Sequence, residues 1–370
     1  MTHTRFTLIL PLLLITSAVA QQPPAKSDPD VLTFVNGEKL IGHLVRSDGS
    51  TVTFHSDSMG DIKVDWSKIQ ELRAAASFVA VPKGIILRRH SDVSKLAKGP
   101  VIMTDKTLNV DGQKVPVADT GFLLPQPGFE NSMQHSPGFF HQWKGTVTAG
   151  AALVQATQQS RSYTSAVSLI RTTPSEDWMD ARDRTTFNFS VADGSVKQPG
   201  QPTVKTNILH ADAERDQYLT GSHAYLFGVA AFDHNFSQGL DLQQLYGGGF
   251  GWTIIKMPNQ TLDLKGSMNY ERQSFQVASA DHNLIGSQFS EVYLRKFAKG
   301  MVFAQGVSFT PAWNEASAYS FAANAGLTMP VYKRLAFSVT TLDTFLNDPP
   351  PGFKKNSFQL TMGLTYSLNK

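Results

Sequence analysis

The sequence contains no cysteine among its 370 residues. This absence excludes disulfide bonds, thiol catalysis, sulfur-ligated metal sites and a lipid-anchored N-terminal cysteine. It also suits a chain that crosses an oxidising compartment unfolded, where a free thiol would react. Charged residues are scarce at 17%, against roughly 25% in an average soluble domain. The formal net charge of +3 is not gathered in a basic stripe, so we expect no nucleic-acid partner.

Long apolar runs are also missing, except for a short one at the N-terminus. Arg5 precedes an apolar segment at 6–15, and residues 18–20 have the small-x-small pattern of a signal-peptide cleavage site. An apolar run of about ten residues is half the length that spans a bilayer as a helix. We therefore predict a signal peptide at 1–20 and a disordered polar leader at 21–30. Any membrane-spanning part of the mature chain must then be a β-barrel, since only helices and closed barrels satisfy every backbone group in lipid.

Residues 31–120 contain short alternating segments separated by tight-turn signals. Asn36-Gly37 and Asp111-Gly112 are dipeptides typical of two-residue β-hairpins. These features predict a small periplasmic β-module of the SH3-like or Sm-like type. The same pattern of strands and turns recurs more weakly over 85–124, which indicates a second copy of the module. Such a module either binds a peptide or another domain, or serves as a spacer. The prolines and small polar residues of 121–139 predict a linker after it.

Residues 140–370 have a dominant period of two, which predicts an all-β fold. The clearest face belongs to the last strand: Phe358, Leu360, Met362, Leu364, Tyr366 and Leu368. The alternating runs last about 10–15 residues, whereas soluble strands average about five or six. Thirteen residues at about 3.3 Å each, tilted by about 40–45°, rise about 30 Å and cross an outer membrane. We therefore predict a transmembrane antiparallel β-barrel of about twelve strands, with a long-stranded soluble β-sandwich as the alternative.

Turn signals place the individual strands. The expected strands are 142–155, 160–172, 180–193, 203–217, 222–233, 240–256, 260–275, 287–297, 300–313, 318–329, 333–346 and 354–368. Even-numbered connections are mostly tight and odd-numbered ones longer, apart from 173–179 and 314–316. Outer-membrane barrels have short periplasmic turns and longer external loops, so both termini and the N-terminal module are expected in the periplasm.

Aromatic residues support the same topology by forming two expected girdles. The periplasmic girdle is expected to contain Trp143, Trp178, Tyr218, Trp252, Phe297, Tyr332 and Tyr366. The outer girdle is expected to contain Phe232, Phe275, Trp313 and Phe345.

Several short motifs in the barrel segment resemble a known family. They are 143–145 (WKG), 215–218 (RDQY) and 246–252 (YGGGFGW), with Tyr270-Glu271 after them. On these motifs, residues 140–370 are similar to the YdiY-like salt-induced outer-membrane proteins, a domain of unknown function. Upstream, 36–42 (NGEKLIG) and 62–66 (IKVDW) are similar to the small periplasmic segment that often precedes such barrels. The resemblance implies an outer-membrane barrel linked to salt stress and transfers no catalytic residues. One departure is that the chain does not end on an aromatic residue.

Polar side chains on the faces opposite the apolar ones supply the candidate functional residues. The expected lumen-lining set is Arg184, Asp263, Lys265, Asn269, Glu271, Glu291 and Arg295. Mixed charges of this kind either bond across a lumen and hold the barrel together, or line a modest aqueous channel. We therefore expect a non-enzymatic protein of the outer membrane, without cofactor or metal. It would be a narrow passive channel for small polar solutes or a structural barrel useful under osmotic stress. Its expected partners are outer-membrane lipid and the insertion machinery.

Two alternatives belong to other functional classes. A lipid hydrolase could use His234, Asn235 and Ser237, and a protease could use Asp281-His282, each at the extracellular rim. The members of each set lie together in a single loop. A nucleophile and its base also need a third group that orients the base, and neighbouring residues of one loop rarely supply it. The histidines show no HExxH spacing for a metal. The other class is a docking or adhesion protein whose periplasmic module recruits a partner.

Overall fold

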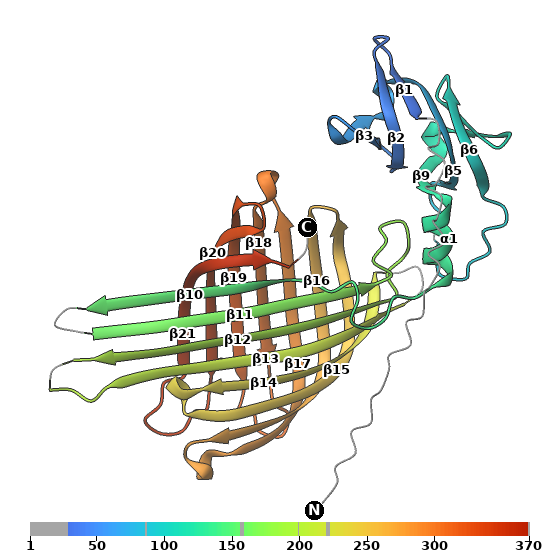
Figure 1. Ribbon diagram of the computed structural model, residues 1–370. Coiled ribbons are helices and arrows are strands. Elements are labelled where there is room, and N and C mark those ends of the chain that lie inside the picture. Colours follow the sequence, from blue (N-terminus) through green and yellow to red (C-terminus); the bar gives the residue numbers. More distant parts are fainter. Residues whose placement is uncertain (1–28, 86, 156–158, 199, 220–222, 369–370) are drawn as a thin grey trace, which may run out of the picture. The chain divides into compact units, whose positions relative to one another are not determined.

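The computed structural model describes residues 29–85, 87–155, 159–198, 200–219 and 223–368 (Figure 1). The predicted signal peptide and most of the predicted leader lie outside these residues. Within them, no helix has the length and apolar character needed to cross a membrane. The chain forms two compact units. The first contains the chain up to residue 85 and residues 92–131, and the second contains 86–91 and everything from 132 onward.

The first unit is a small all-β module with one closed ring. Its strands are β1 (Asp30–Phe34), β2 (Lys39–Ser47), β3 (Thr51–Ser56), β4 (Gly60–Asp65), β5 (Ile69–Pro82), β6 (Ala97–Thr104), β7 (Thr107–Val110), β8 (Gln113–Pro116) and β9 (Thr120–Pro125). The sheet order is β4-β3-β2-β1-β5-β6-β7-β8, and β9 pairs with both β2 and β5. Strands β1, β2, β9 and β5 therefore form a four-stranded barrel. Short 3-10 turns, η1 (Trp66–Lys68) and η2 (Val117–Asp119), precede β5 and β9 in the same way.

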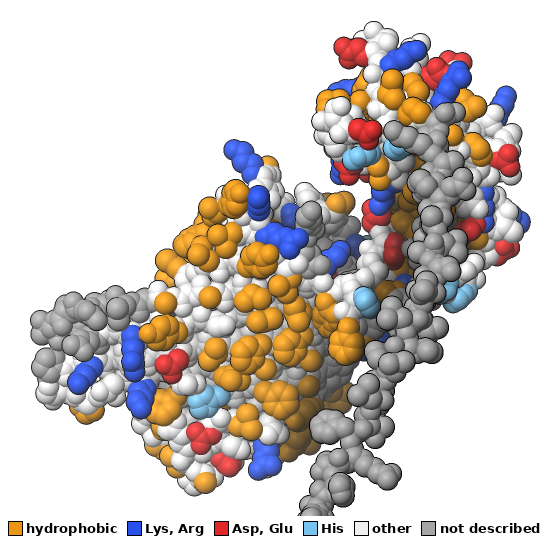
Figure 2. All heavy atoms as spheres, in the orientation of Figure 1, with side chains coloured by type: hydrophobic (Ala, Val, Ile, Leu, Met, Phe, Trp, Pro, Cys, Tyr) orange, Lys and Arg blue, Asp and Glu red, His pale blue; other side chains and the backbone are white. Residues whose placement is uncertain are grey.

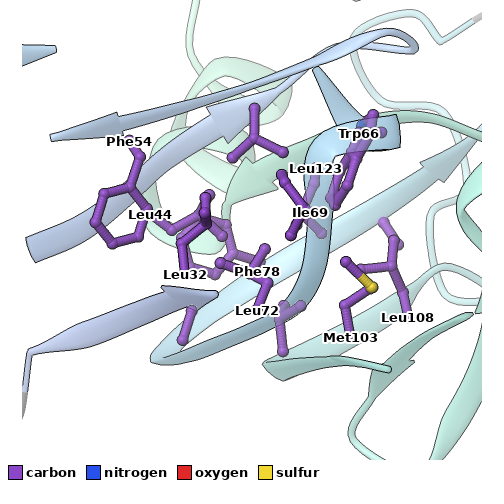
Figure 3. Close-up of a cluster of buried hydrophobic side chains, with 14 of the residues drawn as sticks. Leu32, Leu44, Phe54, Trp66, Ile69, Leu72, Phe78, Met103, Leu108 and Leu123 are labelled. Atoms are coloured by element: carbon purple, nitrogen blue, oxygen red, sulfur yellow. The ribbon is translucent and has the colours of Figure 1, made fainter. Parts of the chain in front are cut away.

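Alternating apolar side chains fill the core of this module (Figure 3). Leu32, Phe54, Leu72 and Leu108 are fully buried. Trp66 belongs to the same cluster, and its side chain is 7% exposed. Each buried side chain of this size stabilises the fold by about 1.5–3 kcal/mol. The short strands of the module thus combine into one core.

The segment 121–139 contains regular structure where a linker was expected. Residues 120–125 form β9, and α1 (Gln126–Gln134) follows directly. Pro125 ends the strand because it has no N–H to donate to a neighbour, while Pro127 fits the first turn of a helix, where no donor is needed. The prolines therefore separate two elements, and the first unit continues to residue 131.

The second unit is a closed barrel in which each strand pairs antiparallel with the next, and the last with the first (Figure 1). Its strands are β10 (Lys144–Gln155), β11 (Gln159–Thr173), β12 (Asp183–Lys197), β13 (Val204–Tyr218), β14 (Ala224–Asn235), β15 (Leu240–Met257), β16 (Gln260–Phe275), β17 (His282–Lys296), β18 (Val302–Thr310), β19 (Ser320–Tyr332), β20 (Leu335–Leu346) and β21 (Asn356–Ser367). The predicted antiparallel barrel of twelve strands is confirmed. The largest shifts in boundary are the start of β17, at 282 where 287 was expected, and the end of β12, at 197 where 193 was expected.

Connection lengths separate the two ends of the barrel. The turn between β15 and β16 has two residues, 258–259, whereas 311–319 joins β18 to β19 and 347–355 joins β20 to β21. Because β18 ends at Thr310, the connection expected to be short at 314–316 is long after all. We call the end with the long loops the loop end, and the other the turn end.

One long connection, 174–182 after β11, remains at the turn end. It contacts Leu87, which is distant in the sequence and belongs to the same unit. Leu87 forms a β-bridge with Met179, and both side chains are buried. The Asp180 N–H donates to the Leu87 carbonyl at 3.3 Å.

The outer surface of the barrel is predominantly apolar (Figure 2). On β21, Phe358, Leu360, Met362 and Leu364 are each more than half exposed. Such a continuous apolar belt is unstable in water and matches the lipid-facing surface of a transmembrane barrel. Three aromatic residues do not join the expected girdles. Tyr218 packs beside Tyr225 on the inner face. Trp178 is buried in the connection 174–182, and Phe275 is buried at the loop end.

Candidate functional site

An ion pair across the lumen shows which strand faces point inward. The Arg184 Nη2 group on β12 lies 2.9 Å from an Asp263 oxygen on β16, although three strands separate these elements in the barrel wall. The Arg184 Nε group also lies 2.5 Å from Asp216 on the neighbouring β13. Asp216 and Asp263 are 1% and 8% exposed. A bond that bypasses three strands must run through the interior, so these side chains line the lumen.

A second pair repeats this arrangement. The Lys265 ammonium on β16 bonds to the Glu214 carboxylate on β13, and both side chains are 12% exposed. The ammonium also lies 5.5 Å from the centre of the Phe227 ring on β14. The contact with an aromatic face stabilises the buried cation further.

Glycines on β15 make room for the side chains of this network. A Cβ atom on Gly251 would lie 2.3 Å from the Tyr225 ring, and one on Gly247 would lie 2.3 Å from Asn269 Oδ1. The Tyr225 ring in turn faces the Arg184 guanidinium at 5.2 Å. The glycine run of 247–251 therefore permits close approach of inward side chains rather than phosphate binding, since it lies inside a strand.

Nearer the loop end, a histidine lies between two carboxylates. The two ring nitrogens of His210 lie 2.6 Å from Asp233 and 2.9 Å from Asp212. Asn188 donates to Asp212, and Ser168 donates to Asn188 at 2.7 Å. These bonds extend the polar network across β11 to β14.

Carboxylates outnumber cations on the wall formed by β12–β16. The inward carboxylates are Asp212, Glu214, Asp216, Asp233, Asp263 and Glu271, and the inward bases are Arg184, Lys256, Lys265 and His210. Glu271 is buried and accepts a bond from Gln273 at 2.6 Å. This wall therefore carries an excess of carboxylates, and its field favours cations.

The opposite wall has small or hydroxyl-bearing side chains and remains open. Ala304, Asn324 and Thr340 on β18–β20 point inward by register yet are exposed. Val292 on β17 is opposite Asp263 and is 42% exposed. Inward side chains that contact solvent indicate space in the lumen beside this wall.

Five of the seven expected lumen residues lie on the inner face: Arg184, Asp263, Lys265, Asn269 and Glu271. Glu291 and Arg295 do not, which corrects the expectation. They pair with Leu264 and Gln260 on the outer face, and the Arg295 guanidinium lies 5.0 Å from the Phe297 ring. Polar residues occur on both faces of β17, so its alternation could not identify the inner one.

The loop between β14 and β15 extends across the mouth of the barrel at the loop end. The Gln238 amide nitrogen donates to the carbonyls of Thr344, at 3.2 Å, and Lys355, at 2.8 Å. These residues belong to β20 and the loop after it, and Gln238 is only 2% exposed. Beside it, the Leu240, Phe275 and Leu346 side chains form a buried apolar cluster. We call Gln238 and this cluster the outer closure.

A family model described as a protein of unknown function, DUF481, matches residues 147–368, more than half of the chain. The chain belongs to the DUF481 family. No curated protein matches this sequence.

Several solved structures are similar to this DUF481 chain. An outer membrane channel from Pseudomonas putida F1 is 13% identical, with 64% of this chain and 100% of that one covered and a TM-score of 0.37. The NanC porin is 7% identical, with coverage of 61% and 100% and a TM-score of 0.37. The translocator domain of the autotransporter NalP from Neisseria meningitidis is 10% identical, with coverage of 60% and 87% and a TM-score of 0.31.

In the DUF481 barrel, the side chains of the two candidate catalytic sets bond to groups at the loop end. His234 Nδ1 contacts the Asp241 carbonyl at 2.8 Å, while Asn235 accepts from the Ser237 N–H at 3.1 Å. Asp281 accepts from the Phe275 N–H at 2.8 Å, and His282 contacts Glu315 at 3.1 Å. Each candidate base thus contacts a partner outside its proposed catalytic set.

Proposed function

We propose that the barrel is a narrow passive passage for small polar solutes through the outer membrane, with a preference for cations. The observation that carries this proposal is the open inner wall of β18–β20, which faces a wall where carboxylates are in excess. A ring or wall of carboxylates favours cations in a narrow pore. The protein acts as a passage and not as an enzyme, and it requires no cofactor.

The orientation follows from the connection lengths. The turn end, with turns such as 258–259 and 333–334, faces the periplasm, because outer-membrane barrels keep short turns there. The first unit then lies in the periplasm. The salt-stress role implied by the resemblance to YdiY-like proteins fits a pore for small ions.

Single-channel conductance of the full-length protein in planar bilayers tests the proposal, after heat-modifiable migration on gels confirms folding. We expect small, steady conductance with cation selectivity. Thr340→Lys adds a cation to the open wall and should lower the ratio of cation to anion permeability by at least about fivefold, since a charge at about 4 Å in water changes the energy of a passing cation by about 1 kcal/mol and that of an anion in the opposite direction. Arg295→Gln is the control, because Arg295 lies on the outer face, and it should leave the ratio unchanged.

Two outcomes would overturn this proposal. Selectivity for anions would contradict the charge argument, and a folded protein that never conducts would contradict the passage itself. The second result would support a structural barrel, which the cross-lumen pairs and the outer closure favour. Deleting the module at 31–120 separately tests a docking role, through the proteins that co-purify.

A further inference from the structure

Three potential metal ligands converge at the loop end of the barrel. His282 begins β17, Glu315 lies in the loop 311–319, and Asp348 lies in the loop 347–355. One ligand atom from each of these residues lies within 4.8 Å of the other two. His282 Nδ1 and Glu315 Oε2 are 3.1 Å apart. Successive members are 33 positions apart in the sequence (315 − 282 and 348 − 315), so the fold alone brings them together.

Bonds between the loops hold this arrangement in place. The Asn347 side-chain amide donates to the Ser317 carbonyl at 2.9 Å, and the Asn347 N–H donates to Tyr319 at 3.0 Å. The Ser317 hydroxyl lies 3.5 Å from Asp348. Within the other loop, the Ala318 N–H donates to the Glu315 carbonyl at 3.0 Å. The two carboxylates therefore come from loops bonded to each other by their main chains.

The histidine is fixed from the opposite side. The edge of its ring meets the Phe275 ring at a centroid distance of 6.0 Å, and the His282 side chain is only 14% exposed. Glu315 and Asp348 are more open, with the Glu315 side chain at 40% exposure. A buried imidazole beside two open carboxylates leaves the solvent side free for water ligands.

We propose that His282, Glu315 and Asp348 form a binding site for a divalent transition-metal cation such as Zn²⁺. One imidazole nitrogen and two carboxylate oxygens suit Zn²⁺, which takes three protein ligands and water in open sites. Mg²⁺ and Ca²⁺ prefer sites made of oxygen alone. The two carboxylates repel one another without a cation, and a bound divalent ion removes this repulsion.

A metal bound at this site would also affect the outer closure, and this effect depends on the passage proposed above. Phe275, which contacts His282, belongs to the apolar cluster of the closure together with Leu346, and Leu346 directly precedes the loop that contains Asp348. A metal bridging these loops stabilises the closed mouth. External Zn²⁺ should therefore lower the conductance.

Calorimetric titration of the folded full-length protein with Zn²⁺ tests the site directly, and Co²⁺ absorption reports its ligands. We expect saturable binding of one ion. Binding should weaken about tenfold or more in Asp348→Asn and in His282→Ala, because each removes one of three ligands. His234→Ala and Asp241→Asn change the same residue types at the loop end and should bind as the unchanged protein does. Heat-modifiable migration shows whether each variant folds, and Glu315→Gln provides a third, nearly isosteric test.

Absence of saturable binding, or binding unchanged in Asp348→Asn and Glu315→Gln, would overturn the site and leave an ion pair between His282 and Glu315 only. The binding measurement does not depend on conductance, so it separates the two proposals. Binding without an effect of Zn²⁺ on a conducting protein would keep the site and refute its link to the closure.

Discussion

Glycines and tyrosines determine how the inner wall packs at single positions. The ring of Tyr225 occupies the space in front of Gly251, where a Cβ would come within 2.3 Å of it. The face of the same ring lies 5.2 Å from the Arg184 guanidinium. The absence of a side chain on β15 thus allows an aromatic ring to hold an ion pair in the lumen.

We predict that Gly251→Ala destabilises the barrel by about 1–3 kcal/mol, because the added methyl group overpacks the site. Gly266→Ala is the matched control: Gly266 pairs with the outward Phe250, and its Cβ would come no closer than 3.9 Å to the Phe289 ring. The control should change stability by less than about 0.5 kcal/mol. Urea unfolding of the protein in lipid vesicles measures both, and equal effects would contradict the packing argument.

Asp48 shows how one residue determines a turn in the first unit. Its carboxylate accepts from the Ser50 and Thr51 N–H groups at 2.9 and 2.7 Å. Partial burial raises the pKa of Asp48, but these bonds more than offset it, so the pKa lies below its ordinary value. The stabilisation is therefore present above the ordinary Asp pKa of about 4 and lost as the pH falls through the lowered value.

We predict that Asp48→Ala destabilises this turn by about 1 kcal/mol. Hydrogen exchange of the Ser50 and Thr51 amides should accelerate about fivefold near neutral pH. The difference between the variant and the unchanged protein should shrink in acid. A difference that grows in acid would contradict the sign of the pKa argument.

Among elements, the short segment η3 (Phe236–Gln238) joins two sides of the barrel mouth. It connects two neighbouring strands, yet Gln238 bonds to main-chain carbonyls near the far side of the barrel. Gly239 follows with φ of 68° and packs against the Phe353 ring. This loop therefore crosses the mouth of the barrel and joins its two sides.

We predict that Gln238→Ala loosens this loop, because the Thr344 and Lys355 carbonyls each lose the hydrogen bond from Gln238, at a cost of about 0.5–1.5 kcal/mol for each bond. Hydrogen exchange of residues 236–239 and 353–355 should accelerate, and conductance should rise if the lumen is a passage. Ser237→Ala serves as the control, since the Ser237 bond to Asn235 uses its N–H group. Unchanged exchange in Gln238→Ala would show that the closure does not depend on this residue.

At the scale of the whole molecule, pairs across the lumen connect strands that never touch in the wall. Arg184 on β12 bonds across the lumen to Asp263 on β16, and it also bonds to Asp216 on the neighbouring β13. Its side chain is 19% exposed and its partner Asp216 is 1% exposed. Removing one partner of such a buried pair leaves the other charge uncompensated.

We predict that Arg184→Gln lowers the free energy of unfolding of the barrel by about 3–5 kcal/mol. Arg215→Gln is the control. Arg215 lies 3.6 Å from Asp183 and is 55% exposed, so its loss should cost less than about 1 kcal/mol. Urea unfolding in vesicles compares the two variants, and similar losses would mean that the lumen pairs add nothing to barrel stability.

The sequence by itself determined the barrel, its strand number and most strand boundaries. Period-two alternation is a local property, and runs long enough to cross a membrane have few other solutions. It also identified five inward residues on β12 and β16, where charged and apolar faces separate cleanly. The prolines of 121–139 predict a linker and not a strand followed by a helix, because composition cannot distinguish a proline that ends a strand from one in a disordered segment.

Only the tertiary structure decided what depends on register and on closure of the barrel. The inner face of β17 follows from its pairing with β16, so Glu291 and Arg295 could not be assigned from alternation that has polar residues on both faces. The bonds of Gln238 across the mouth and the convergence of His282, Glu315 and Asp348 join residues that are far apart in the chain. Spacing along a sequence carries no information about such contacts, because closing the sheet into a ring is what brings these loops together.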